Sequence, residues 1–122
     1  MDRPLKQIDV KRQNDVFCVR LRKQKLEEDD LHQLSEDFAR LVDNDGCRKL
    51  VLNFGPEGPA CLYSIFLAKL VSLQRRLVQA GGALRLAQVG SDTLKIFEAC
   101  KLQKLFTFSP DEQSAVAELS QI

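Results

Sequence analysis

Apolar and polar positions in the middle of the chain predict a strand, a loop, a long helix and a second strand, in this order. Residues 50–54 form an almost uninterrupted apolar run, typical of a strand covered on both faces, and the Gly and Pro residues at 55–59 end it. From 63 to 80 apolar residues recur around most of a helical circumference, so we expect this helix to be largely buried and to end at Gly81. Alternating apolar and polar residues predict the second strand at 83–89.

This order of elements predicts a right-handed parallel crossover. In such a unit the loop 55–64 lies at the carboxyl end of the first strand. Ligands and partners of open α/β sheets bind at that edge. The loop and the helix start after it are therefore the candidate functional site.

Two shorter patterns precede the crossover. Polar and apolar positions alternate at 8–12 and 16–22 around Gln13-Asn14-Asp15, which predicts a β-hairpin. The next helix has acidic residues at 27–30 near its amino end, where the helix dipole favours them, and Gly46 beyond its carboxyl end. Its predicted buried residues are Leu31, Leu34, Phe38, Leu41 and Val42.

A third helix, a short strand and a fourth helix complete the chain. The third helix begins after Ser91. Its expected inward residues are Leu94, Phe97 and Cys100. A short strand at 105–108 precedes the last helix, for which Ser109 is the predicted N-cap. With no repeat or linker, we expect a single domain over residues 1–122 with its core at about 8–119.

Composition narrows the classes of function. With 44% hydrophobic and 29% charged residues among 122, the chain fits one globular domain. Its longest apolar run is far shorter than the ~20 residues that span a bilayer, and residues 1–6 lack an apolar signal segment, so we expect a cytoplasmic protein without membrane insertion. Four scattered cysteines and the single His32 favour neither a metal site nor a redox motif, and we expect no cofactor. A net charge of +1 argues against a nucleic-acid partner.

Charge is unevenly distributed along the first third of the chain. Residues 1–26 hold eight Lys or Arg against three Asp, whereas residues 27–45 hold eight acidic residues against Arg40. Two interpretations are open: these are solvated faces, or they mark a docking surface that orients a partner electrostatically.

Four segments together carry a family resemblance. They read Lys49-Leu-Val-Leu-Asn-Phe-Gly, Ala60-Cys-Leu-Tyr-Ser-Ile-Phe-Leu-Ala-Lys-Leu, Gln79-Ala-Gly-Gly-Ala-Leu-Arg-Leu and Ile96-Phe-Glu-Ala-Cys-Lys-Leu-Gln-Lys-Leu-Phe. In this order they resemble a STAS domain, the fold of bacterial anti-sigma-factor antagonists, over nearly the whole chain. The resemblance implies an α/β fold with a central mixed β-sheet of about four to five strands and helices packed mainly on one side.

The resemblance also implies a function. STAS domains of this kind are non-enzymatic regulatory modules in signal transduction, which bind an anti-sigma-factor kinase-like ATPase and thereby free a sigma factor. The second Ser of an Asp-Ser-Ser-Gly motif at the helix start is phosphorylated in the family. Phosphate adds a charge of about −1.5 to −2 to a packed contact, and this opposes docking. The expected function is therefore partner switching in transcription regulation.

The present chain departs from the family motif. Aligning the helix places Tyr63 at the Asp, Ser64 at the first Ser and Ile65 at the usual phosphoacceptor, which leaves that position without a hydroxyl. A slip of one residue in the preceding loop would bring Ser64 onto the acceptor position. The domain is then either a degenerate, constitutive STAS module or one phosphorylated on Ser64. A structural role as N-cap of the helix would also explain Ser64.

The resemblance predicts a partner-binding surface at residues 58–67. The predicted contact residues are Gly58, Pro59, Ala60, Cys61, Leu62, Tyr63, Ser64, Ile65 and Leu67. An alternative within the same fold is a structural STAS subunit of a phospholipid-transport ABC assembly, which binds the ABC-transporter ATPase without phosphorylation. An enzyme is a third alternative, but the sequence offers no cluster of titratable residues to support it, and no catalytic residue is predicted.

Overall fold

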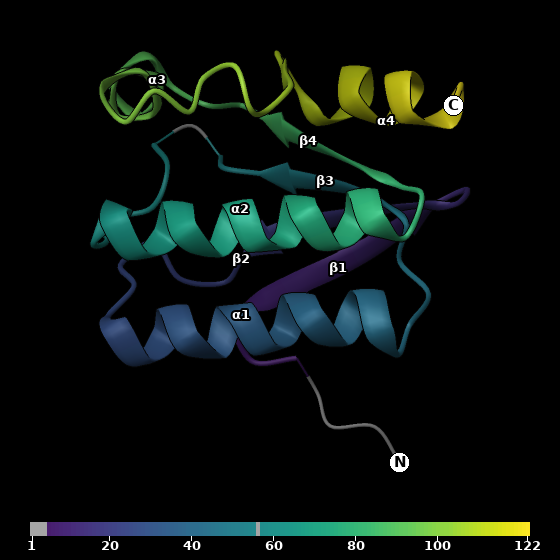
Figure 1. The fold of residues 1–122 in the computed structure, drawn as a ribbon, viewed down its shortest axis with the longest axis horizontal. Coiled ribbons are helices and arrows are strands. Elements are labelled where there is room, and N and C mark those ends of the chain that lie inside the picture. Colours follow the sequence, from purple (N-terminus) through teal and green to yellow (C-terminus); the bar gives the residue numbers. More distant parts are fainter. Residues whose placement is uncertain (1–4, 56) are drawn as a thin grey trace.

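A mixed β-sheet forms the centre of the molecule (Figure 1). The computed structural model describes residues 5–55 and 57–122, so Pro56 of the predicted turn and Arg3 of the basic segment lie outside the described residues. Within this part the sheet has five strands in the order β1-β2-β3-β4-β5. They are β1 (Ile8–Gln13), β2 (Val16–Leu21), β3 (Lys49–Asn53), β4 (Ala83–Ala87) and β5 (Phe108–Ser109). Strand β1 pairs with β2 antiparallel and the other pairs are parallel, which confirms the predicted mixed sheet.

Three of the four helices in the described part share one face of the sheet. Side chains of α1 (Glu28–Asp43), α2 (Tyr63–Gln79) and α3 (Ser91–Ala99) join one core cluster with the inner residues of β2, β3 and β4. The opposite face is covered by α4 (Glu112–Ser120), whose Ala115, Val116 and Leu119 pack on Val16 and Val51. The prediction of helices mainly on one side is confirmed.

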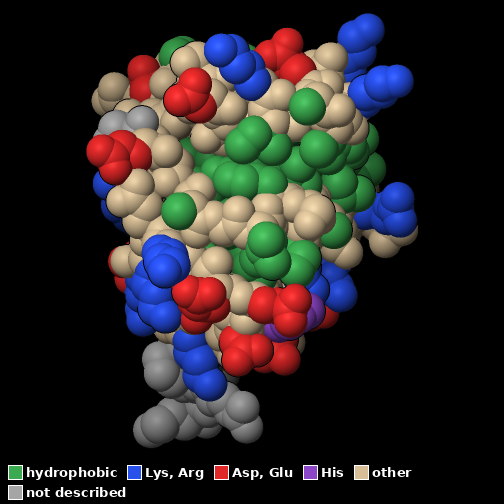
Figure 2. Space-filling view, turned by 90° about the vertical axis from the view of Figure 1, so that its left-hand side faces the viewer, with side chains coloured by type: hydrophobic (Ala, Val, Ile, Leu, Met, Phe, Trp, Pro, Cys, Tyr) green, Lys and Arg blue, Asp and Glu red, His purple; other side chains and the backbone are tan. Residues whose placement is uncertain are grey.

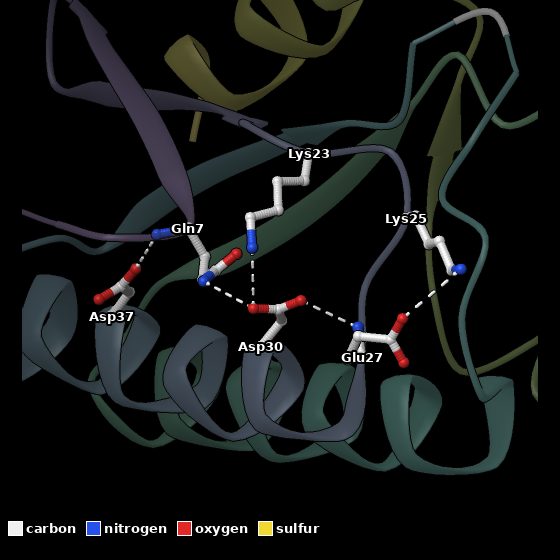
Figure 3. A network of polar contacts seen from close by, with 6 residues as sticks. All are labelled: Gln7, Lys23, Lys25, Glu27, Asp30 and Asp37. Carbon is white, nitrogen blue, oxygen red and sulfur yellow. Dashed lines mark hydrogen bonds and ion pairs between the residues drawn. The ribbon is translucent and has the colours of Figure 1, made fainter.

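The hairpin and the first helix form as their patterns predict. The turn between β1 and β2 places Asn14 at φ 58°, a left-handed conformation that Asn tolerates better than most residues. Glu27 is the N-cap of α1, and Asp30 Oδ2 accepts a hydrogen bond from the Glu27 amide in a capping box (Figure 3). All five predicted inward residues of α1 are buried.

The crossover also has the predicted topology. Strands β3 and β4 are parallel with Leu52 opposite Leu86, and α2 connects them. The helix ends at Gln79, and Gly81 follows at φ 85°, a conformation that glycine adopts without steric cost. Gly82 is required for a different reason: a Cβ there would lie 1.7 Å from the Arg48 carbonyl oxygen.

Three local predictions are wrong. Asp111 is the N-cap of α4 and accepts the Ser114 amide at 2.7 Å, whereas Ser109 belongs to β5 and its hydroxyl donates to Glu118 Oε1. Cys100 is exposed because it follows the last residue of α3; of the other two residues expected to point inward, Phe97 is buried and Leu94 is partly buried. The strand expected at 105–108 is limited to Phe108–Ser109.

Helix α2 is less buried than predicted. Its inward face consists of Phe66, Leu67, Leu70, Leu73 and Leu77. Val78 is 60% exposed, although the apolar pattern at 63–80 predicted a largely buried helix. The apolar residues around most of this helix therefore do not mean that every face of it is covered, because some of them face solvent.

Candidate partner-binding site

Three connections meet at the carboxyl edge of the parallel strands. The segment 22–27 follows β2, the segment 54–62 follows β3 and the segment 88–90 follows β4. Helices α1, α2 and α3 all begin at this edge, at the left-hand end of the molecule in Figure 1. The candidate loop lies at the middle connection, as the crossover predicts.

The candidate loop is held by the neighbouring segment 22–27. The Ala60 amide donates to Gln24 O at 2.7 Å, and the Leu26 amide donates to Ala60 O at 2.9 Å. The Gln24 side chain donates to Glu57 Oε2 at 2.8 Å and to Gly58 O at 3.2 Å. These bonds fix the backbone immediately before α2, so the exposed groups of the helix start have a defined geometry.

Tyr63 anchors the start of α2 to the loop and to α3. Its hydroxyl donates to Pro59 O, and its ring lies edge-on to Phe66 with centroids 5.7 Å apart. Burial raises the pKa of the Tyr63 hydroxyl, and a hydrogen bond with Thr93 acts in the opposite direction. Gly58 has φ 72°, and a Cβ added there would lie only 3.0 Å from Thr93 Oγ1, which is tighter than an ordinary contact. The loop is therefore packed tightly on the beginning of α3.

The nine predicted contact residues separate into a presented and a supporting group. Ala60, Leu62 and Ser64 are exposed, and Cys61, Tyr63 and Ile65 are partly buried. Gly58, Pro59 and Leu67 are buried; Leu67 is 2% exposed, so its side chain faces the core and not a partner. The surface offered by this segment thus consists mainly of Ala60, Leu62, Ser64 and Ile65.

Ser64 is not the N-cap of α2. Leu62 occupies that position and makes no side-chain capping bond, which places Ser64 at the second helical residue. The prediction of a capping role was wrong because the helix begins two residues earlier than a cap at Ser64 requires. The exposed Ser64 hydroxyl therefore does not cap this helix end.

A small pocket of about 280 Å³ lies beside the loop. Its lining residues are Leu21, Arg22, Lys23, Gln24, Phe54, Glu57, Gly58 and Pro59. Both cations are held by acidic residues: Arg22 Nε lies 2.9 Å from Asp9 Oδ1, and Lys23 Nζ lies 3.1 Å from Asp30 Oδ1. The pocket mouth is therefore electrostatically balanced.

The basic and acidic segments of the sequence lie side by side in space. Figure 3 shows Lys23 on Asp30 and Lys25 on Glu27, with Gln7 donating to Asp30 as well. Hydrogen bonding from the Glu27 amide and from Lys23 lowers the pKa of Asp30. These charges mainly neutralise one another at the β2–α1 connection, which favours the interpretation as solvated faces over a charged docking surface.

Sequence reasoning missed the residues that support the site from other elements. Gln24 and Thr93 belong to elements far from 58–67 in sequence, and no motif marks either of them. Only the crossover topology indicates that the segments after β2 and β4 approach the same edge.

Across 5–55 and 57–122 no group of three or more His, Cys, Asp or Glu could hold a metal ion. No helix in these ranges is long and apolar enough to cross a membrane.

Solved structures share this architecture. A STAS-domain protein from Planctomyces limnophilus matches with a TM-score of 0.74 at 19% identity, covering 90% of this chain and 96% of that one. The chain has the STAS fold. An anti-sigma factor antagonist from Mycobacterium paratuberculosis matches with a TM-score of 0.75 at 19% identity over 98% and 99% of the two chains. Phosphorylated SpoIIAA, a Bacillus cell fate determinant, matches with a TM-score of 0.68 at 15% identity over 91% and 97%.

These likenesses establish the STAS fold. Protein-family models and curated proteins were also compared with the chain, and none matches. In this fold the candidate site at the start of α2 lies at the carboxyl edge of the parallel strands.

Proposed function

We propose that the chain is a regulatory STAS domain that binds a protein partner, an ATPase of the anti-sigma-factor kinase type, through Ala60, Leu62, Ser64 and Ile65. The observation that carries this proposal is the exposure of Leu62 at the start of α2. Leu62 is 58% exposed at an N-cap position, where Ser, Thr, Asp and Asn are preferred, and it forms no cap. An exposed leucine on a rigid helix start contributes little to the free domain, whereas a partner would cover it.

Ser64 supplies a means of regulation in this proposal. Its exposed hydroxyl lies in the first turn of α2, where backbone N–H groups and the helix dipole stabilise an anion. A phosphate on Ser64 is therefore compatible with the free domain. In the complex the same phosphate would place about −1.5 to −2 charges beside Leu62 and Ile65, and it would release the partner.

The test is affinity capture from the host lysate with three tagged proteins. The wild type, Ser64→Glu and Ser120→Glu are compared; Ser120 is an exposed serine at the end of α4, on the opposite face of the sheet, and serves as the matched control. We expect a histidine-kinase-like ATPase with the wild type and with Ser120→Glu, and its loss with Ser64→Glu. Equal capture by all three proteins would contradict docking at the start of α2.

The structural subunit of an ABC assembly remains the second candidate. Ile65, partly buried at the aligned acceptor position, favours it because no hydroxyl is available there for a switch. In the same experiment this function predicts an ABC-transporter ATPase that is retained by Ser64→Glu. The identity of the captured ATPase and its response to the charge thus separate the two functions.

A further inference from the structure

A second apolar surface lies on the other side of α2 from Leu62. Val71 and Val78 are two helical turns apart on one stripe of α2, and Gln74 between them donates its side-chain amide to Leu105 O. This bond brings the segment after α3 against α2. Val78 and Leu105 are 60% and 45% exposed, and Val71 and Leu102 are partly buried against the core. Figure 2 faces the end of the molecule where α2 and α3 begin and shows an apolar area there. Because Val78 lies near the opposite end of α2, the second surface is defined by its residues and not by this view. We name Val71, Val78, Leu102 and Leu105 the α2–102 patch.

Cations without acidic partners surround the α2–102 patch. Arg75, Lys101 and Lys104 are exposed, and none of them forms a salt bridge within the described residues. Neither α2 nor the segment 99–110 contains a single Asp or Glu. Around β1, β2 and the β2–α1 connection, by contrast, Lys11, Arg20, Arg22, Lys23 and Lys25 are paired with acids. The patch therefore combines an apolar centre with an uncompensated positive rim.

The backbone conformation of Lys101 independently indicates that a cation beside the patch has a function. It follows the C-cap of α3 at φ 60°, in the left-handed region where glycine is the usual residue. A lysine there carries a backbone strain that glycine would avoid. The sequence thus places a cation beside the apolar patch at a position where a neutral glycine would fit the backbone better.

We propose that the α2–102 patch docks an acidic amphipathic segment of a second protein, with apolar residues on Val71, Val78 and Leu105 and carboxylates on Arg75, Lys101 and Lys104. Val71 and Val78 are about 10 Å apart along the helix, which matches two turns of a partner helix with apolar residues at i, i+3 and i+7. Opposite charges at the rim orient such a segment. The proposal goes beyond the function proposed for the start of α2 and does not rest on it.

Two other occupants fit less well. A second copy in a two-fold contact would bring the unpaired cations of the two patches together, and the acidic outer face of α1 presents no large exposed apolar side chain to a heterologous copy. An anionic bilayer would have to take in the apolar side chains to a depth of about 5–10 Å. Val71 and Leu102 are too recessed for this, although a complementary protein surface reaches them.

Two labelled synthetic helical peptides test the proposal. One carries leucines at i, i+3 and i+7 with flanking glutamates, and the other has lysine in place of each glutamate. Binding is measured by fluorescence anisotropy, and the contact surface is mapped by amide chemical shifts of the protein. We expect the acidic peptide to shift residues 71–78 and 101–105 and to bind at least tenfold more tightly than the basic peptide.

Variants of the protein give the sharper comparison. Lys101→Glu with Lys104→Glu is expected to weaken binding of the acidic peptide at least tenfold. Lys6→Glu with Lys11→Glu has the same charge change but lies just before β1 and within it, and it is expected to weaken binding less than threefold. Lys101→Gly is expected to raise the melting temperature and still weaken binding about threefold, so loss of folding cannot explain the effect. Ser64→Glu is expected to leave peptide binding unchanged, which separates this patch from the start of α2.

The results that would overturn the proposal are equally specific. Equal affinity for both peptides, or chemical shifts outside the patch, would exclude an acidic amphipathic ligand. Binding to vesicles of phosphatidylcholine and phosphatidylserine without peptide binding would assign the patch to a membrane surface. A dimer in sedimentation that Val78→Asp dissociates would assign it to a second copy.

Discussion

The first turn of α2 exposes a leucine where most helices place a polar cap. Leu62 leaves the first amides of the helix without a side-chain acceptor, and its own side chain is 58% exposed. Its side chain therefore supplies no capping hydrogen bond to the helix. A residue that is suboptimal for the free protein and is presented on a fixed backbone is what a binding surface requires.

Replacing Leu62 by serine should separate stability from binding. Leu62→Ser supplies a capping oxygen, so we expect the free energy of unfolding to rise by about 0.5–2 kcal/mol in urea denaturation. The same change removes the apolar contact and is expected to weaken capture of the partner. Leu62→Ala, which lacks a cap, should weaken capture without the gain in stability. A stability loss in Leu62→Ser would show that the leucine itself supports the helix start.

The four thiols differ in environment, and their reactivity should follow it. Burial raises the pKa of Cys47 to about 12 and that of Cys61 to about 11, so both thiols are almost entirely protonated at pH 8. Cys100 is exposed. With iodoacetamide at pH 8 and peptide mass spectrometry, we expect Cys100 to react first, Cys61 slowly, and Cys18 and Cys47 only after unfolding.

The same shifts give stability a pH dependence. In the unfolded chain a thiol ionises near 9.0, whereas the folded protein keeps Cys47 and Cys61 protonated. A raised folded pKa stabilises the fold fully below pH 9, and this contribution is lost as the pH rises from 9 towards 12. The urea midpoint should therefore be lower at pH 10 than at pH 8, and this difference should be smaller in Cys47→Ala.

At the scale of elements, backbone contacts decide details that periodicity cannot. The β3–α2–β4 crossover follows from the order of apolar runs, and Gly81 follows from the need to end a helix. The N-cap of α4 lies at Asp111 and not at Ser109, because pairing of β5 with β4 already uses Ser109. The apolar pattern placed the start of α2 correctly at residue 63, but it gave Ser64 a capping role that the structure does not show. Backbone hydrogen bonds from the Ala60 amide to Gln24 O and from the Leu26 amide to Ala60 O hold the chain just before the helix. Such contacts come from segments distant in sequence.

Gly82 shows how closely two such segments approach. Its missing Cβ would lie 1.7 Å from the Arg48 carbonyl oxygen, and a backbone atom cannot move away as a side chain can. We expect Gly82→Ala to destabilise the protein by about 3 kcal/mol or more in urea denaturation. Gly81→Ala, where only the left-handed conformation is affected, should cost about 1–2 kcal/mol. Equal losses of stability in the two variants would show that the backbone at Arg48 moves away easily from an added Cβ at residue 82.

Asp37 links the segment before β1 to helix α1. Its carboxylate is 4% exposed and accepts the Gln7 amide at 2.8 Å and the Lys6 amide at 3.1 Å (Figure 3 shows the first of these). Asp37→Ala leaves a buried amide without a partner, and we expect a loss of about 1–3 kcal/mol. Hydrogen exchange should accelerate at Gln7 in this variant. Glu36→Ala, exposed on the same helix, is the control and should be nearly neutral.

At the scale of the whole molecule, the α/β class, the mixed sheet and the helix order could all be predicted. The fold class, the sheet and the helix order depend on alternating apolar positions and on continuous apolar runs, and both patterns can be read from local sequence. The pattern could not predict which apolar residues of α2 remain exposed: Leu77 is fully buried in the core, Val71 is partly buried against it, and Val78 is 60% exposed. The α2–102 patch and the supporting role of Gln24 and Thr93 are consequences of that packing, so the candidate site was located but not its boundaries.

The two faces of the sheet are covered unequally, and this should govern how the fold fails. Three helices cover one face, whereas α4 is the cover of the other face in the described part, where Leu119 is fully buried against a layer that includes Val51 and Ala87. We expect Leu119→Ala to cost about 2–5 kcal/mol, as for other buried leucines. Because α4 has only nine residues to hold it, loss of this anchor should detach the helix before the rest unfolds.

Dye binding and hydrogen exchange distinguish local from global loss in Leu119→Ala. Local detachment predicts binding of an apolar dye in native buffer and faster exchange at 112–120, with β3 and α2 still protected. Gln113→Ala, exposed on the same helix, should show neither effect. Uniform loss of protection across all strands would instead mean that α4 and the main core form one cooperative unit, in which case a partner bound at the start of α2 would also stabilise the opposite face of the sheet.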